Sequence, residues 1–570
     1  MPWRADSPAR SHRQRESHRK ITSSGLFLLE RFFVEETLKT RYNICMKMDS
    51  AIPTHVQQHD HQGPTAGTEV RLPKWEELSR TSQFAIYLSL WFGIYVVSSL
   101  FLPFSLPIYL VFVVGLVPMI FMAPQAGLLM TLILTMLFER WFTLQPILLG
   151  SGQEELLFYP IDAVISISLL AALAGWARER STQTKEGRTV REVWKSPLTT
   201  WLWVFWCATA IILGWSVLQH GDTSLIVSAG KQLYWYAFMV GMVLLTTRTK
   251  RDLFRIEKTL ILGSLFTLGF LALAIVRGDG LWTEFQPLST EGTRLLSQTH
   301  AFFLGLGSLF LLARLPNLVG RWRWFAGAAI LLQWAGVALS LTRHLYVALP
   351  VGAAVLFILL SRSERWKLVR AGSKAAVAGI VLMVAALLIA VLVPNQSAWE
   401  ISKPGESIVR RIESFGNPRE DASTLYRLEA WKAAGNEWLG NPILGIGFGQ
   451  QLFFDVGGYP TIAEVRGLHN DIYGLLVQGG LLLFIPFMIM AFRGFWLGIV
   501  ASRDAKDARL REVAMASSAG LAMFGVAAFF STYLIINLFI IFFWLLLAML
   551  MLTARFSQEE GERVGEQGNA

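Results

Sequence analysis

The chain has 570 residues, of which 53% are hydrophobic and only 16% are charged, and its formal net charge is +10. A soluble domain carries about 25% charged residues, so this composition excludes an ordinary soluble enzyme and indicates a membrane protein. The positive charge is explained by basic cytoplasmic loops, which membrane proteins accumulate, and no nucleic-acid partner is expected. The two cysteines, Cys45 and Cys207, are too few for a disulfide framework or a cysteine-rich metal site.

The first 80 residues are polar, basic and rich in Ser, His and Arg. No apolar segment near Met1 has the character of a secretory signal. We expect residues 1–80 to be a disordered cytoplasmic tail, within which Met46 and Met48 are alternative start residues.

Long apolar segments follow this tail. Residues 84–104 and 259–276 contain no charged side chain, and about 20 such residues cross the hydrocarbon core of a bilayer as a helix. The segments do not alternate in polarity as the strands of a membrane barrel do, so we expect helices. The candidate spans lie at about 84–102, 106–122, 125–141, 159–177, 199–219, 230–247, 258–276, 299–315, 325–341, 345–361, 375–393, 471–491, 513–531 and 534–554.

From residue 178 onwards, basic residues gather in every second loop, as the positive-inside rule requires of cytoplasmic loops. We therefore predict an all-α, polytopic membrane helix bundle over residues 81–555, with about 12–14 transmembrane helices. One large loop, 394–470, would lie on the far side of the membrane, and residues 556–570 would form a cytoplasmic C-terminal tail. The expected cytoplasmic loops are 178–198, 248–257, 314–324, 362–374 and 492–512.

The large loop contains a segment, 423–440, in which Leu425, Leu428, Trp431 and Ala434 recur at helical spacing. This pattern predicts an amphipathic helix that lies on the membrane or on the bundle. An ordinary packed loop helix is the equal alternative.

Three glycines, Gly445, Gly447 and Gly449, follow that segment. A nucleotide-binding loop would need a strand before it and a helix after it, and that context is not expected here. We interpret the run as a tight turn that lets two stretches of backbone approach closely.

Three ionisable residues lie at span ends on the far side of the membrane: Arg294, Arg343 and His469. Charged groups at membrane depth are costly and mark functional sites. Two guanidinium groups suit a diphosphate, and a histidine titrating near neutrality can take a proton from a hydroxyl nucleophile. This set suits transfer from a lipid diphosphate to an alcohol. The alternative is structural, with arginines that snorkel to the interface and residues 469–471 that cap a helix.

The second half of the chain also carries polar, aromatic and glycine residues in a fixed order: Arg427, Trp431, Pro442, Gly445, Gly447, His469 and Asn470. This order resembles the signature region of the O-antigen ligase and polymerase superfamily. The segments around Arg294 and Arg343 resemble two arginine segments of that family, although His344 stands where the family has a small residue. The resemblance covers about residues 290–490.

The resemblance implies a glycosyltransferase of the bacterial inner (cytoplasmic) membrane, with its active site facing the periplasm. It would take a glycan from an undecaprenyl-diphosphate carrier and pass it to lipid A-core, another glycan or a protein hydroxyl, with membrane lipids as further partners. No cofactor and no metal ion are expected, since arginines would neutralise the leaving diphosphate.

The resemblance also assigns roles to individual residues. His469 would be the base that activates the acceptor hydroxyl, and Arg294 and Arg343 would hold the diphosphate. Arg427 and Asn470 would bind substrate. His344 would also bind substrate, or would act as the base in place of His469.

A second function class is a transporter or flippase of a lipid-linked or anionic solute. Transporters often contain inverted repeats and discontinuous helices. The two halves of this sequence show no convincing repeat, and a transporter has no need of a large loop that leads into a His-Asn helix start. A structural subunit of an envelope complex is a third possibility, but no specific motif in the sequence indicates it.

Overall fold

The computed structural model describes part of the chain, all of it within one compact unit, Trp75–Ala570. The expected tail, the expected span at 375–393 and Arg294 lie outside the described residues. The division into a tail, a membrane domain and a C-terminal tail therefore stays a prediction. The described residues are Tyr87, Trp91, Ile94, 106–137, 147–149, 156–158, 160–181, 196–277, 296–373, 422–456, 458–534 and 539–568.

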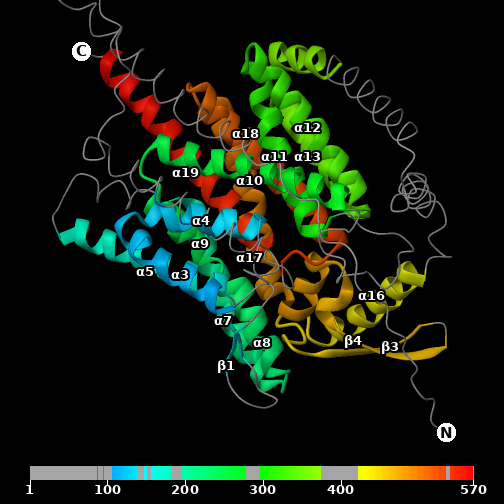
Figure 1. Ribbon diagram of the computed structural model, residues 1–570. Coiled ribbons are helices and arrows are strands. Elements are labelled where there is room, and N and C mark those ends of the chain that lie inside the picture. Colours follow the sequence, from blue (N-terminus) through cyan, green and yellow to red (C-terminus); the bar gives the residue numbers. More distant parts are fainter. Residues whose placement is uncertain are drawn as a thin grey trace, which may run out of the picture. The chain divides into compact units, whose positions relative to one another are not determined.

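Helices make up most of this part of the chain (Figure 1). Two antiparallel hairpins accompany them, β1–β2 and β3–β4. The first half contains α3 (Leu106–Met122), α4 (Pro124–Leu137), β1 (Ile147–Leu149), β2 (Leu156–Phe158), α5 (Pro160–Ser181), α7 (Pro197–Leu218), α8 (Thr223–Gly230), the π-helical η3 (Lys231–Trp235), α9 (Phe238–Thr246) and α10 (Lys250–Arg277). The second half contains α11 (Gln298–Arg314), η4 (Leu315–Asn317), α12 (Arg321–Leu339), α13 (Arg343–Leu359), α16 (Ala422–Gly440), β3 (Gln451–Val456), β4 (Tyr459–Glu464), η5 (Val465–Leu468), α17 (Asp471–Asp504), α18 (Ala508–Phe530) and α19 (Phe539–Gly568).

Six of the described helices are long and apolar enough to cross a membrane: α5, α7, α11, α17, α18 and α19. Two shorter apolar helices, α4 and α13, add to them. The predicted all-α polytopic bundle is therefore confirmed, and the total of about 12–14 spans stays a prediction. The helix α17 runs on to Asp504, well past the span end expected at 491, and α19 continues to Gly568.

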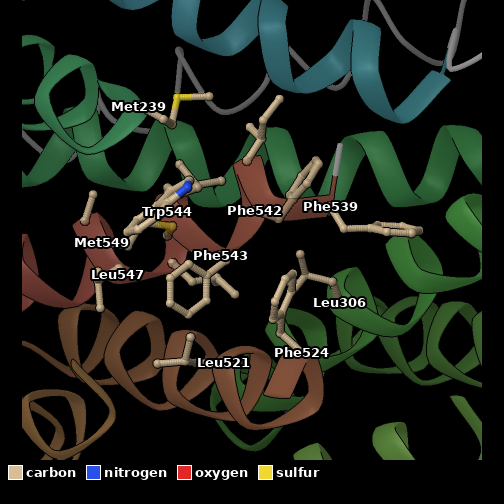
Figure 2. Close-up of a cluster of buried hydrophobic side chains, with 14 of the residues drawn as sticks. Met239, Leu306, Leu521, Phe524, Phe539, Phe542, Phe543, Trp544, Leu547 and Met549 are labelled. Atoms are coloured by element: carbon tan, nitrogen blue, oxygen red, sulfur yellow. The ribbon is translucent and has the colours of Figure 1, made fainter. Parts of the chain in front are cut away.

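The apolar part of α19 is buried almost completely. This burial shows that α19 lies in the middle of the bundle. A helix that is apolar on all sides is typical of such a position. Figure 2 shows Phe543 of α19 facing α18, and its ring centroid lies 5.4 Å from that of Phe524. On the side of α7, Trp544 packs against Phe205 with ring centroids 5.5 Å apart.

Four helix ends meet on one side of the bundle, which we call the His469 end. Gln298, at the start of α11, donates to Ser531, just after α18. His344, at the start of α13, is hydrogen-bonded to Tyr533. The backbone N–H of Tyr533 in turn donates to Asp471, at the start of α17.

The opposite side of the bundle, which we call the Glu257 end, is held by ion pairs. Buried Glu257 of α10 contacts Arg314 at the end of α11 (3.5 Å) and Arg509 at the start of α18 (3.1 Å). Lys250, which begins α10, pairs with Glu560 of α19. Residues from four of the five loops predicted to be cytoplasmic, 248–257, 314–324, 362–374 and 492–512, therefore meet at this end. Most of the fifth predicted loop, 178–198, lies outside the described residues.

A break in α17 organises the backbone of the large loop. Gly480 has φ +57°, which interrupts the helix. The turn Pro442–Gly449 packs against this break. The backbone N–H of Leu481 donates to the carbonyl of Pro442 (2.9 Å), and the backbone N–H of Gly447 donates to the carbonyl of Gln478 (3.0 Å). A Cβ atom on Gly445 would lie 2.5 Å from the carbonyl oxygen of Val477. The predicted close approach of two stretches of backbone is confirmed.

The helix α16 packs on the β3–β4 hairpin and on the start of α17 (Figure 1). Its buried positions are Ala430 and Ala434, whereas Leu425 and Leu428 are exposed. Of the four positions expected to share an apolar face, Trp431 and Ala434 pack into the small core of this region, together with Tyr426 rather than Leu425. Neither the β1–β2 nor the β3–β4 hairpin was predicted by the apolar pattern.

We expect Gly480→Ala to lower the stability of the protein. The left-handed backbone costs a residue with a side chain about 1–3 kcal/mol, and the new Cβ would lie 2.2 Å from the carbonyl oxygen of Ile443. The matched control is Gly525→Ala in α18, where no atom lies within 4 Å of the new Cβ. Thermal unfolding in detergent should show a lower apparent Tm for the first variant only. Equal behaviour of the two variants would contradict the structural role of the break.

Candidate functional site

His469 occupies a special backbone position between η5 and α17. Its φ is +53°, in the left-handed region, which residues with a Cβ seldom adopt outside turns and functional sites. The next residue, Asn470, caps α17, since its Oδ1 accepts from the N–H of Tyr473 (3.0 Å). Asn470 is therefore a helix cap, as the structural alternative expected. A role of Asn470 in substrate binding stays a prediction. The His469 side chain itself is exposed.

Two hydrogen bonds fix α16 against this turn. The indole N–H of Trp431 donates to the carbonyl of Leu468 (2.8 Å), next to His469. The hydroxyl of Tyr473 donates to the carbonyl of Trp431 (3.0 Å). The Arg and Trp of the sequence motif therefore lie on a helix that is tied directly to the candidate base.

The surroundings of His469 favour its neutral form. The protein atoms around the ring lower the pKa of His469 by desolvation, and the positive charge of Arg427 lowers it further. Both causes disfavour the imidazolium, which is the charged form. At neutral pH the ring is therefore in the form that can accept a proton. Arg427 of α16 therefore lies close enough to His469 for its charge to act on the imidazole.

Arg343 and His344 begin α13 at the same end of the bundle. The preceding turn is sharp, with Leu341 at φ +54°. Among the residues that the structure describes, three non-glycine residues have positive φ: His220, Leu341 and His469. Two of them adjoin the candidate site, and strained backbone is typical of functional sites.

The link between α18 and α19 joins these two helix starts. Nε2 of His344 is hydrogen-bonded to the hydroxyl of Tyr533 (2.8 Å), and their rings meet edge to face. Oδ2 of Asp471 accepts the backbone N–H groups of Tyr533 and Leu534. Asp471 is only 2% exposed, so these bonds form away from water, where they are strongest.

Sequence reasoning missed Tyr533 entirely and treated Asp471 only as part of a helix cap. Tyr533 lies in the short link between α18 and α19, and Asp471 is the first residue of α17. A signal was present in the polar run Ser531–Thr532–Tyr533 between two apolar segments, since polar groups inside membrane bundles need partners.

The structure leaves parts of the predicted site open. Arg294 lies outside the described residues, four positions before α11 begins at the His469 end. No group of three His, Cys, Asp or Glu side chains in the described ranges is placed to hold a metal ion. The candidate site therefore comprises His469 with Arg427 nearby, and Arg343 and His344 at the same end of the bundle, while Asn470, Asp471 and Tyr533 make hydrogen bonds beside them; the functional role of each residue stays a prediction.

We expect Asp471→Ala to destabilise the protein strongly, because two buried N–H groups would lose their acceptor at about 1–3 kcal/mol each. Asp471→Asn keeps one acceptor oxygen and should be milder. The matched control is Asp455→Ala, which removes a similar bond to the N–H of Gly458 at an exposed turn. The apparent Tm should be highest for the control Asp455→Ala, lower for Asp471→Asn and lowest for Asp471→Ala. A control that unfolds as early as Asp471→Ala would refute the assignment.

One family comparison matches this region of the chain. Residues 328–488 match the family described as O-antigen ligase. The matched segment contains Arg343, His344, Arg427, His469 and Asn470. The comparison with individual curated proteins gave no match. The match supports a multi-pass membrane protein that transfers glycans in polysaccharide biosynthesis. It supports the resemblance stated from the sequence: residues 328–488 are similar to the O-antigen ligase family of the ligase and polymerase superfamily.

Proposed function

We propose that this protein transfers a glycan from an undecaprenyl-diphosphate carrier to an acceptor hydroxyl, at the periplasmic face of the bacterial inner membrane. The observation that carries the proposal is geometric: His469 stands in a left-handed turn, α16 is bonded to that turn through Trp431, and the charge of Arg427 on the same helix acts on the imidazole. These residues lie inside the segment that matches the O-antigen ligase family. A proton acceptor next to a positive charge suits a reaction that deprotonates a hydroxyl and releases an anion.

The reaction balances with these residues alone. The acceptor oxygen attacks the anomeric carbon of the carrier-bound sugar while its proton passes to the imidazole of His469. The bond between that carbon and the diphosphate oxygen breaks, and its electron pair leaves with the undecaprenyl diphosphate. Arg343 and Arg427 would stabilise the developing negative charge, with Arg294 as a third contact. The acceptor is lipid A-core, another glycan or a protein hydroxyl.

His469 suits the role of the base better than His344 does. Nε2 of His344 is already engaged with the hydroxyl of Tyr533, whereas the His469 side chain is exposed. We assign His344 to the support of Arg343 and to substrate binding.

The direction of the site follows from charge. The Glu257 end collects the basic loops, including Arg314, Arg509 and Lys250. The positive-inside rule assigns such an end to the cytoplasm. The His469 end would then face the periplasm, where a lipid-linked glycan is available after it has been flipped.

One observation favours the transporter alternative. Asp162, at the start of α5, is buried and contacts Lys231 (3.3 Å) and the hydroxyl of Tyr236 (2.7 Å). Lys231 begins the π-helical segment η3, and such segments occur frequently at functional sites. A buried ion pair inside a membrane domain is what an ion or proton path requires.

The decisive experiment supplies purified undecaprenyl-diphosphate glycan and candidate acceptors to the protein in liposomes. His469→Asn removes the imidazole, and Asn tolerates the left-handed backbone that His469 adopts. We expect transfer to fall by about 10²–10⁴-fold, with carrier binding retained. The matched control is His220→Asn, because His220 is an exposed histidine with φ +54° at a different loop; it should transfer normally.

Two results would contradict the proposal. Full transfer by His469→Asn would remove His469 from the mechanism. A wild type that transfers to no acceptor, but supports solute flux that Asp162→Asn abolishes, would establish the transporter instead.

The pH profile of transfer gives a second prediction. If His469 is the base, activity is lost as pH falls through its lowered pKa. Arg427→Gln removes one cause of that lowering, so the pKa rises and the acid limb of kcat/KM should move to higher pH. The control Lys432→Gln, on the exposed side of α16, should leave the limb in place. If the acid limb of kcat/KM stays in place in Arg427→Gln, then Arg427 does not influence the pKa of the catalytic base.

A further inference from the structure

The corner where α16 ends exposes large aliphatic side chains. Leu439 is 68% exposed and Ile443 is 65% exposed. From Trp438 to Phe454 the chain contains no charged residue. We call Trp438–Ile443 the apolar corner. Exposed apolar clusters of this kind mark surfaces that are covered in the working protein.

The apolar corner adjoins the lipid-facing surface of α17. The N–H of Leu482 donates to the carbonyl of Ile443 (3.0 Å), so this residue lies directly against the helix. Leu481 and Ile485 of α17 are exposed. Because α17 is long and apolar enough to span the membrane, we expect these exposed apolar side chains to face lipid.

The same turn also reaches the end of α7, a second candidate span. The indole N–H of Trp215 donates to the carbonyl of Gly445 (3.1 Å). Val217 and Leu218, on the last turn of α7, are exposed. The apolar corner is therefore flanked by lipid-facing residues of two helices that pack against each other.

We propose that the apolar corner inserts into the lipid interface at the His469 end and anchors α16 there. The occupant of this surface is the bilayer, because the corner continues a lipid-facing surface and carries no charge. Trp438 supports this choice, since its indole N–H donates to the carbonyl of Pro442 (3.2 Å) and tryptophan is enriched at membrane interfaces. On the N-terminal side of the apolar corner, α16 exposes the charged side chains of Lys432 and Glu437. The contact with lipid is therefore confined to the corner itself.

The anchor has a consequence for the site, which rests on the proposed function. It would hold α16, and with it Arg427, at the depth of the lipid headgroups. A carrier lipid presents its diphosphate at that depth. The carrier would then meet the arginine without leaving the membrane.

The test uses a fluorescent label on single cysteines in a Cys45→Ser, Cys207→Ser background. Leu439→Cys and Ile443→Cys are compared with Lys432→Cys, whose side chain on the same helix is 69% exposed. Each labelled protein is placed in phosphatidylcholine nanodiscs that contain lipids spin-labelled near the top of the acyl chain. Iodide serves as the quencher from water, and apparent Tm values check that each variant is folded.

We expect the labels at 439 and 443 to be quenched about threefold or more by the spin-labelled lipid relative to the label at 432, as for side chains within the upper part of the leaflet. Iodide should show the reverse order. Equal quenching at all three positions would overturn the proposal. Labels at 439 and 443 shielded from both quenchers would also overturn it and would indicate a protein contact. The result is independent of glycan transfer, so failure of the proposed function would leave it unchanged.

Discussion

The backbone hydrogen bonds between the turn Pro442–Gly449 and the break in α17 at Gly480 position the rest of the site. A broken helix exposes peptide groups that a continuous helix pairs internally, and in a membrane each unpaired group costs several kcal/mol. The turn supplies partners for these groups, so the break and the turn stabilise each other. The short first part of α17, which begins next to His469, is thus held by the turn at one end and by α16 at the other. The turn also binds α7 through Trp215 and Ser216. One set of contacts therefore fixes the large loop to two spans.

The two ends of the bundle use their charges differently. At the Glu257 end, carboxylates and arginines from several helices pair with each other, and this closes the end that carries the basic loops. At the His469 end, Asp471 is committed to backbone N–H groups, and Arg427 lies beside a histidine whose pKa it lowers. Left-handed backbone at Leu341 and His469 adds local strain. Such an arrangement is costly for folding and is frequent at functional sites, which is why we propose the His469 end as the site of transfer.

The sequence predicted the helical bundle, the grouping of its loops and the close glycine turn, because each depends on a local signal: apolar length, basic residues or glycine at left-handed positions. It also predicted that Arg343 and His469 belong to one end. The role of Tyr533 was not predicted, because its hydrogen-bond partners, His344 and Asp471, lie far from it in the sequence. The buried face of α16 was predicted only in part: Ala434 and Trp431 pack into the small core as expected, but Ala430 packs there too while the larger Leu425 and Leu428 stay exposed. Hydrophobicity alone does not record which side chains fit a given surface.

The most direct test of the account is a structure of the protein in lipid with a non-transferable undecaprenyl-diphosphate glycan bound. We predict that the diphosphate lies between Arg343 and Arg427, with the anomeric carbon of the sugar on the side of His469 and the lipid tail leaving towards the bilayer. A diphosphate bound at the Glu257 end, or beside Asp162 and Lys231, would contradict it.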